Sequence, residues 1–228
     1  MHPREAIKRL RDLSDPEAVK GMARFGITPD KAFGVSIPEL RKLAKEIGAD
    51  HRLALRLWVA GYRETRILAS MIEDPALVAE EQAESWVHDF TYWEICDQCC
   101  MNLLEDTGFA HRKCVEWAAR PEEFVKRAGF VLMARLAVSD KKADDDEFLK
   151  FLPLIKREAS DERNFVKKAV NWALRQIGKR SLKLNRSAIR TAREIQAIDS
   201  RSAKWIASDA LRELESKPVQ EKLLSKKK

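Results

Sequence analysis

Two residues one helical turn apart offer the clearest chemistry in this sequence. Trp93 and Asp97 are four positions apart, so on a helix their side chains share one face with Cβ atoms about 5–6 Å apart. A carboxylate stabilises positive charge that develops on a reacting group, and an indole offers an electron-rich face to a cation. Arg127 and Trp172 occupy related places on two later predicted helices. We therefore predict that one carboxylate, two indoles and one guanidinium converge on a single groove.

A basic segment lies in the last third of the chain. Between Arg163 and Lys204 there are twelve Lys or Arg and two acidic residues, an excess of ten positive charges in a chain whose net charge is +7. Such a segment is typical of a surface that meets nucleic-acid phosphates, although the solvated face of a charged helical protein has the same composition. The cations predicted to contact phosphates are Lys167, Lys168, Arg175, Lys179, Arg180, Lys183 and Arg186.

The elements that must position these residues are helices. Apolar residues recur at helical spacing, as in the run from Phe124 to Leu136, and no convincing segment alternates with period two. The segments 14–17, 36–39 and 91–94 each match a capping box, in which a hydroxyl and a carboxylate satisfy free amides at a helix start. The sequence predicts an all-α protein with roughly twelve or thirteen helices.

The predicted helices repeat along the chain. Residues 123–128 (EFVKRA) align with 164–169 (NFVKKA) at an offset of 41, a weaker copy follows at 202–207, and 64–69 and 92–97 are more divergent copies. Two helices per unit at offsets of about 30–41 residues are typical of HEAT-type solenoids, which curve around one concave face. We predict one HEAT-like solenoid (an α-α superhelix) with a concave DNA-binding groove over residues 3–215, and a basic, flexible tail at 216–228.

The composition excludes several other classes of protein. The chain has 228 residues, of which 45% are hydrophobic and 35% charged, and this suits a soluble helical protein. It begins without an apolar signal segment and has no run of about 18 apolar residues, so we expect a cytoplasmic protein. The four cysteines, Cys96, Cys99, Cys100 and Cys114, do not match a zinc pattern, and phosphate-binding glycine loops are absent. We expect buried, reduced thiols, no metal and no cofactor.

Four segments together resemble the AlkD-type DNA alkylation repair enzymes, the HEAT-like repeat DNA glycosylases. They are GVSIPELR at 34–41, WEICD at 93–97, FVKRA at 124–128 and FVKKAVNWALR at 165–175, and they extend over almost the whole chain. The resemblance implies that Asp97 is catalytic, that Trp93 and Trp172 flank the lesion nucleotide, and that Arg127 holds its backbone. It also implies a lesion that stays largely stacked in the duplex.

The chemistry of such a lesion agrees with these roles. An N3- or N7-alkylated purine carries a positive charge that weakens its glycosidic bond, and an ionised Asp97 would stabilise the oxocarbenium character of the sugar and direct water to it. We expect a monomeric, monofunctional DNA glycosylase that removes such purines from double-stranded DNA in base excision repair, in the bacterial cytosol or nucleoid. Two alternatives stay open: a DNA-binding HEAT-like protein without catalysis, and a HEAT scaffold for a protein partner. Taken singly, either tryptophan also fits a core position.

Overall fold

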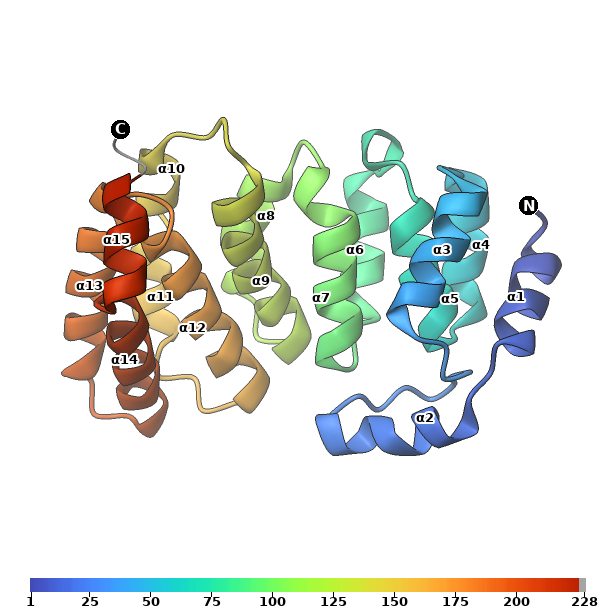
Figure 1. Ribbon diagram of the computed structural model, residues 1–228, viewed down its shortest axis with the longest axis horizontal. Coiled ribbons are helices and arrows are strands. Elements are labelled where there is room, and N and C mark those ends of the chain that lie inside the picture. The colour runs from blue at the N-terminus through green and yellow to red at the C-terminus, as the bar shows by residue number, and fades with distance from the viewer. Residues whose placement is uncertain (226–228) are drawn as a thin grey trace. The chain divides into compact units, whose positions relative to one another are not determined.

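The chain folds into helices, as the periodicity predicts. The computed structural model describes residues 1–225, which form fifteen α-helices and three short 3-10 helices and contain no strand (Figure 1). They fall into two compact units, Met1–Gly108 and Phe109–Lys228. The expectation of a single domain over residues 3–215 stays a prediction.

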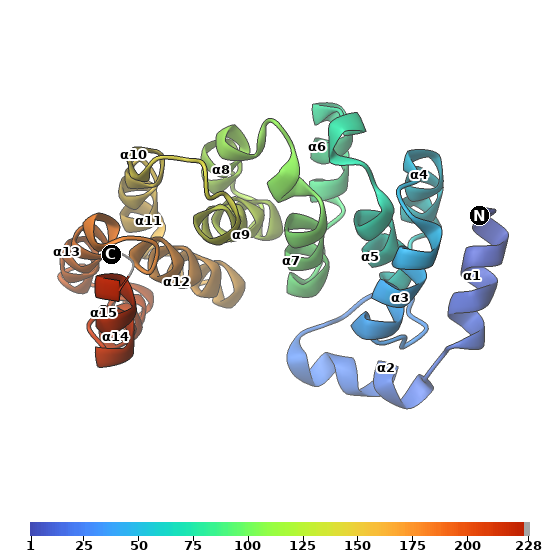
Figure 2. The same ribbon diagram turned by 45° about the horizontal axis from the view of Figure 1, so that its top comes forward.

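The first unit contains seven α-helices within its described residues. They are α1 (Pro3–Asp12), α2 (Pro16–Met22), α3 (Ile37–Ile47), α4 (His51–Ala60), α5 (Arg63–Ile72), α6 (Glu80–His88) and α7 (Trp93–Asn102), with 3-10 turns η1 (Ala23–Phe25), η2 (Pro75–Leu77) and η3 (Leu104–Asp106). Helix α5 packs against α3, α4 and α7 and forms the centre of this unit. Helix α2 runs crosswise to α3, α4 and α5 (Figures 1 and 2).

The second unit contains the repeated segments. Its helices are α8 (Ala110–Ala118), α9 (Glu123–Ser139), α10 (Asp145–Leu149), α11 (Leu152–Glu158), α12 (Asn164–Gly178), α13 (Leu182–Gln196), α14 (Arg201–Leu214) and α15 (Lys217–Ser225). Helix α12 packs against α9, α13 and α14. The two segments aligned at an offset of 41 begin α9 and α12, and their aromatic residues Phe124 and Phe165 lie with ring centroids 5.6 Å apart. The two copies of the repeated segment therefore begin two helices that pack against each other.

Two further expectations concern the tail and the cysteines. The predicted flexible tail includes α15, in which Leu223 is buried, and residues 226–228 lie outside the described residues. The four cysteines are buried thiols, and burial raises the pKa of Cys99, Cys100 and Cys114. Within residues 1–225 there is no helix with the length and apolarity that crossing a bilayer requires.

Candidate functional site

Helix α7 carries the carboxylate and the first of the two predicted indoles. The helix begins at Trp93 and includes Asp97, so the two residues are one turn apart on a single helix. Trp93 is half-buried, whereas only 7% of Asp97 is exposed. A carboxylate largely shielded from water interacts more strongly with a nearby positive charge than one in bulk solvent.

The orientation of Trp93 is set by a segment far away in the sequence. Its indole Nε1 donates a hydrogen bond of 2.7 Å to the backbone carbonyl oxygen of Phe25, at the end of η1. The side chain of Phe25 is 69% exposed, and Gly26 ends the turn in the left-handed conformation (φ 70°). Sequence reasoning did not find Phe25; the signal that was available is an aromatic residue directly before a helix-terminating glycine.

A buried ion pair fixes the first turn of α7 against α5. Arg63 Nε and Nη2 donate to the two carboxylate oxygens of Glu94, each at 2.7 Å, and both side chains are buried. A third donor of Arg63, Nη1, binds the carbonyl oxygen of Val35 at 2.9 Å and Glu64 at 3.0 Å. Glu94 is the neighbour of Trp93 in the chain, so this two-pronged contact anchors the residue next to the indole.

The same cluster holds the segment that returns from η1 to α3. The carboxylate of Glu64 accepts the backbone N–H of Phe33 at 2.8 Å and of Gly34 at 2.9 Å. The Phe33 carbonyl accepts from the N–H of Asp15, the N-cap of α2, at 2.8 Å. Gly34 has φ 87°, and a Cβ there would collide with the Asp15 carbonyl. The buried cluster therefore positions both partners of the contact between Phe25 and Trp93.

The predicted capping boxes have three different outcomes. Ser36 caps α3 and accepts the N–H of Glu39, which confirms that helix start. Helix α2 is capped by Asp15 and not by the preceding serine. Helix α7 begins after Tyr92 without a side-chain cap, so the prediction that Thr91 opens it was wrong. The carboxylate of Glu94 is held by Arg63 instead, because a buried guanidinium requires an anionic partner.

The other two predicted site residues lie in the second unit. Trp172 is half-buried on α12. Arg127 on α9 is only 6% exposed, and its Nη1 donates to the carbonyl oxygen of Phe165 at 2.6 Å. Trp93 and Asp97 thus belong to one unit and Arg127 and Trp172 to the other, and the convergence of all four on one groove stays a prediction.

Two of the predicted phosphate-binding cations pair with acids of α14. Arg175 Nη1 and Asn171 Nδ2 both donate to the Asp209 carboxylate at 2.7 Å, and Lys179 Nζ lies 2.7 Å from Glu213. Although burial opposes its ionisation, the hydrogen bonds from Asn171 and Arg175 hold the pKa of Asp209 below its usual value. Part of the positive charge counted in the sequence is therefore compensated by acids of the neighbouring helix.

The remaining predicted cations differ in their surroundings. Arg180 donates to the carbonyl oxygens of Ala137 and Ala143. Lys183 pairs with Asp146. Lys168 is exposed on α12, one turn before Trp172, and Arg186 is exposed on α13; neither makes an ion pair within the described residues. Lys168 is thus the predicted contact best placed to meet a ligand beside Trp172.

A family model and a solved structure are similar to this chain over most of its length. A family model described as DNA alkylation repair enzyme matches residues 6–214. One similar solved structure is described as "a new family of proteins related to the HEAT-like repeat DNA glycosylases with affinity for branched DNA structures". It is 19% identical, covers 93% of this chain and 95% of its own, and superposes with a TM-score of 0.77, so the fold is HEAT-like. The search of curated protein sequences found no match.

Proposed function

The chain belongs to the DNA alkylation repair enzyme family, and on this premise we propose that it is a DNA glycosylase that releases N3- or N7-alkylated purines from double-stranded DNA. The observation that carries the proposal is the arrangement on α7. Asp97 follows Trp93 by one turn, and the indole is held by the Phe25 carbonyl. A preorganised indole beside a shielded carboxylate suits a cationic nucleoside.

The proposed reaction is a hydrolysis at the sugar. The bond between C1′ and N9 of the alkylated purine breaks, and its electron pair goes to the purine ring and cancels the positive charge of the base. Asp97 stabilises the positive charge that develops on the sugar, and water adds to C1′ and loses a proton. The leaving base needs no acid, which agrees with a site that has one proposed catalytic carboxylate.

The roles proposed for the second unit concern binding. Trp172 would contact the lesion nucleotide from α12, and Lys168, one turn earlier on the same helix, would contact the adjacent backbone. Arg127 would act from α9, where its contact with the Phe165 carbonyl holds one side of the guanidinium. Double-stranded DNA is the partner in this proposal, and the protein acts as a monomer in the cytoplasm.

The test is base release from methylated duplex DNA. Wild type should release 7-methylguanine or 3-methyladenine, measured by mass spectrometry of the free bases. Asp97→Asn should slow release by about 100-fold or more, because a preorganised charge at a transition state contributes that much, while DNA affinity stays within a few-fold. Asp106→Asn removes an exposed acid of the same unit and serves as the matched control. Unchanged release by Asp97→Asn would refute the catalytic role.

A second candidate is a protein that binds branched DNA and cleaves nothing. The observation that favours it is the affinity for branched DNA ascribed to the similar structure. Mobility shifts with a four-way junction and a linear duplex of the same sequence separate the two candidates. Tight junction binding by a wild-type protein that releases no base would replace the glycosylase proposal with this one. Absence of binding to either DNA would favour the protein scaffold.

A further inference from the structure

The second unit contains a basic pocket, and two residues of its lining, Lys179 and Arg180, are among the cations predicted to contact phosphates. The volume of the pocket is about 660 Å³. The pocket lies where α9 and α12 end and α15 passes, and its lining consists of Ala137, Val138, Lys141, Asp145, Gln176, Lys179, Arg180 and Lys222. This volume is within the range of small-molecule and cofactor sites.

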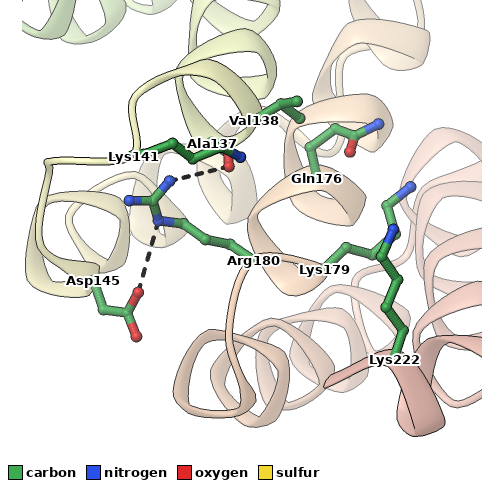
Figure 3. A pocket seen from close by; sticks show the side chains of 8 residues that line it. All are labelled: Ala137, Val138, Lys141, Asp145, Gln176, Lys179, Arg180 and Lys222. Carbon is green, nitrogen blue, oxygen red and sulfur yellow. Dashed lines mark hydrogen bonds and ion pairs between the residues drawn. The ribbon is translucent and has the colours of Figure 1, made fainter. Parts of the chain in front are cut away.

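Cations from three separate elements line the pocket. Lys141 comes from the loop after α9, Lys179 follows α12, and Lys222 lies on α15. Figure 3 shows the side chains of Lys179 and Lys222, which reach the pocket from different elements. The single acidic residue of the lining, Asp145, accepts a hydrogen bond from Ser181 and lies 3.8 Å from Arg180. The lining therefore carries a net positive charge that a bound anion would compensate.

The C-terminal ends of two helices lie at the pocket, and hydrogen bonds to their last carbonyl oxygens weaken the repulsion of an anion. Helices α9 and α12 both end here, and unsatisfied carbonyl oxygens at a helix C-terminus repel negative charge. Arg180 Nη1 donates to the Ala137 carbonyl, and the N–H groups of Lys179 and Arg180 bind the carbonyls of Gln176 and Ile177. These carbonyls are thus capped by the protein itself, and capping does not occupy the ammonium groups of Lys141 and Lys222.

The donors that face the pocket suit a phosphate group. Lys141 and Lys222 are exposed, and neither makes an ion pair within residues 1–225. Gln176 adds an amide, and Lys179 shares its charge with Glu213. A phosphate offers several acceptor oxygens to such donors at once. We propose that this pocket is a phosphate-binding subsite in which Lys141 and Lys222 supply the principal charge.

The position of the pocket favours a phosphate of the DNA backbone. Gln176 and Lys179 follow Trp172 by one and two turns on or just beyond α12, a rise of about 6 and 10 Å. The larger distance equals the rise of about three base pairs along a duplex axis, at 3.4 Å each. This assignment rests on the proposed function, in which α12 contacts DNA. A free phosphate compound is the other source of the same chemistry.

The test compares two double variants of the full chain. Lys141→Ala with Lys222→Ala removes the two lysines of the pocket. Lys142→Ala with Lys217→Ala removes two exposed lysines of the same loop and helix that do not line it. Affinity for linear duplex DNA is measured over a series of salt concentrations. In a second arm, inorganic phosphate is titrated at constant ionic strength while the Gln176 side-chain amide is followed by NMR.

For a backbone phosphate, the pocket variant should bind duplex DNA about tenfold more weakly, with a salt slope lower by about one, and the control pair should bind like wild type. Saturable phosphate binding that only the pocket variant loses, with DNA affinity unchanged, identifies a free phosphate compound instead. Equal losses in both variants, or no loss in either arm, would overturn the proposal. Neither arm needs base release, so a protein without glycosylase activity still gives an answer about the pocket.

Discussion

Glu94 lies in the first turn of α7, and its role is to bind a buried arginine of another helix. Its carboxylate is the two-pronged acceptor of Arg63, and Arg63 in turn reaches Val35 and Glu64. Without Glu94, Arg63 keeps Glu64 as an anionic partner, but its buried Nε and Nη2 donors lose their acceptors. The loss would affect α5, α7 and the segment before α3 at the same time.

Glu94→Ala should therefore lower the free energy of unfolding by about 1–3 kcal/mol, the cost of leaving buried donors without acceptors. Urea denaturation followed by circular dichroism measures the change. Glu81→Ala, an exposed acid on α6, is the control and should change stability by less than about 0.5 kcal/mol. Similar stabilities of the two variants would show that the pair between Arg63 and Glu94 does not hold α7.

Trp172 and Trp205 both lie in the second unit, but only Trp172 is proposed to contact the lesion nucleotide. Trp172→Ala should lower the rate of base release by about tenfold or more, because stacking of a base on an aromatic ring contributes roughly 1–3 kcal/mol. Trp205 on α14 is 41% exposed and packs under Lys167, so Trp205→Ala removes an indole that has no role in the proposed reaction. Single-turnover base release measures both. Equal rates for the two variants would remove Trp172 from the lesion site.

The packing of α8 on α9 depends on one residue without a side chain. Gly129 lies inside α9, where glycine ordinarily destabilises a helix relative to alanine by about 0.5–1 kcal/mol. A Cβ at this position would lie 2.5 Å from the backbone nitrogen of Ala118 at the end of α8. Close approach of two backbones explains why a helix interior contains glycine here.

Gly129→Ala should thus destabilise the protein, although its helix propensity improves. Gly21→Ala is the matched comparison, because Gly21 is also helical and its only close neighbour is the flexible end of Arg24. That substitution should be neutral or stabilising by about 0.5–1 kcal/mol. Thermal unfolding of both variants gives the two signs, and a stabilised Gly129→Ala would show that the two helices can separate at little cost.

Charge compensation between neighbouring elements extends through much of the second unit. A hydrogen bond with His111 lowers the pKa of Asp140. Although burial opposes ionisation, hydrogen bonds also hold the pKa of Asp161 and Asp209 below their usual values. Carboxylates whose pKa is lower in the folded than in the unfolded chain contribute stability above their ordinary pKa, and this contribution is lost as the pH falls through the folded pKa.

Stability should accordingly be nearly constant from neutral pH to about pH 5 and fall steadily below about pH 4. Urea denaturation over a series of pH values measures this dependence. Asp209→Asn removes one of the lowered carboxyls, so the variant should be less stable at pH 7 and lose less than wild type on acidification. Equal stability at pH 3 and pH 7 would contradict the assigned ion pairs.

Local patterns in the chain were enough to predict its helical class and its repeat. Spacing of apolar residues predicted helices, and the alignment of 123–128 with 164–169 identified two helices that pack against each other. The placement of Trp93 and Asp97 one turn apart on the same helix was also predictable, because the proximity of residues i and i+4 depends only on helix geometry. Each of these features is determined within a few turns of backbone.

The partners of the charged and exposed groups followed only from how the helices stack. Arg175 and Lys179 belong to a strongly basic segment, yet Asp209 and Glu213, 34 residues later, compensate them. Trp93 is oriented by a carbonyl 68 residues earlier, and the basic pocket combines the ends of α9 and α12 with a lysine from α15. Ion pairs and pockets form between side chains that tertiary packing brings within a few ångströms, and no local periodicity encodes which elements will be neighbours.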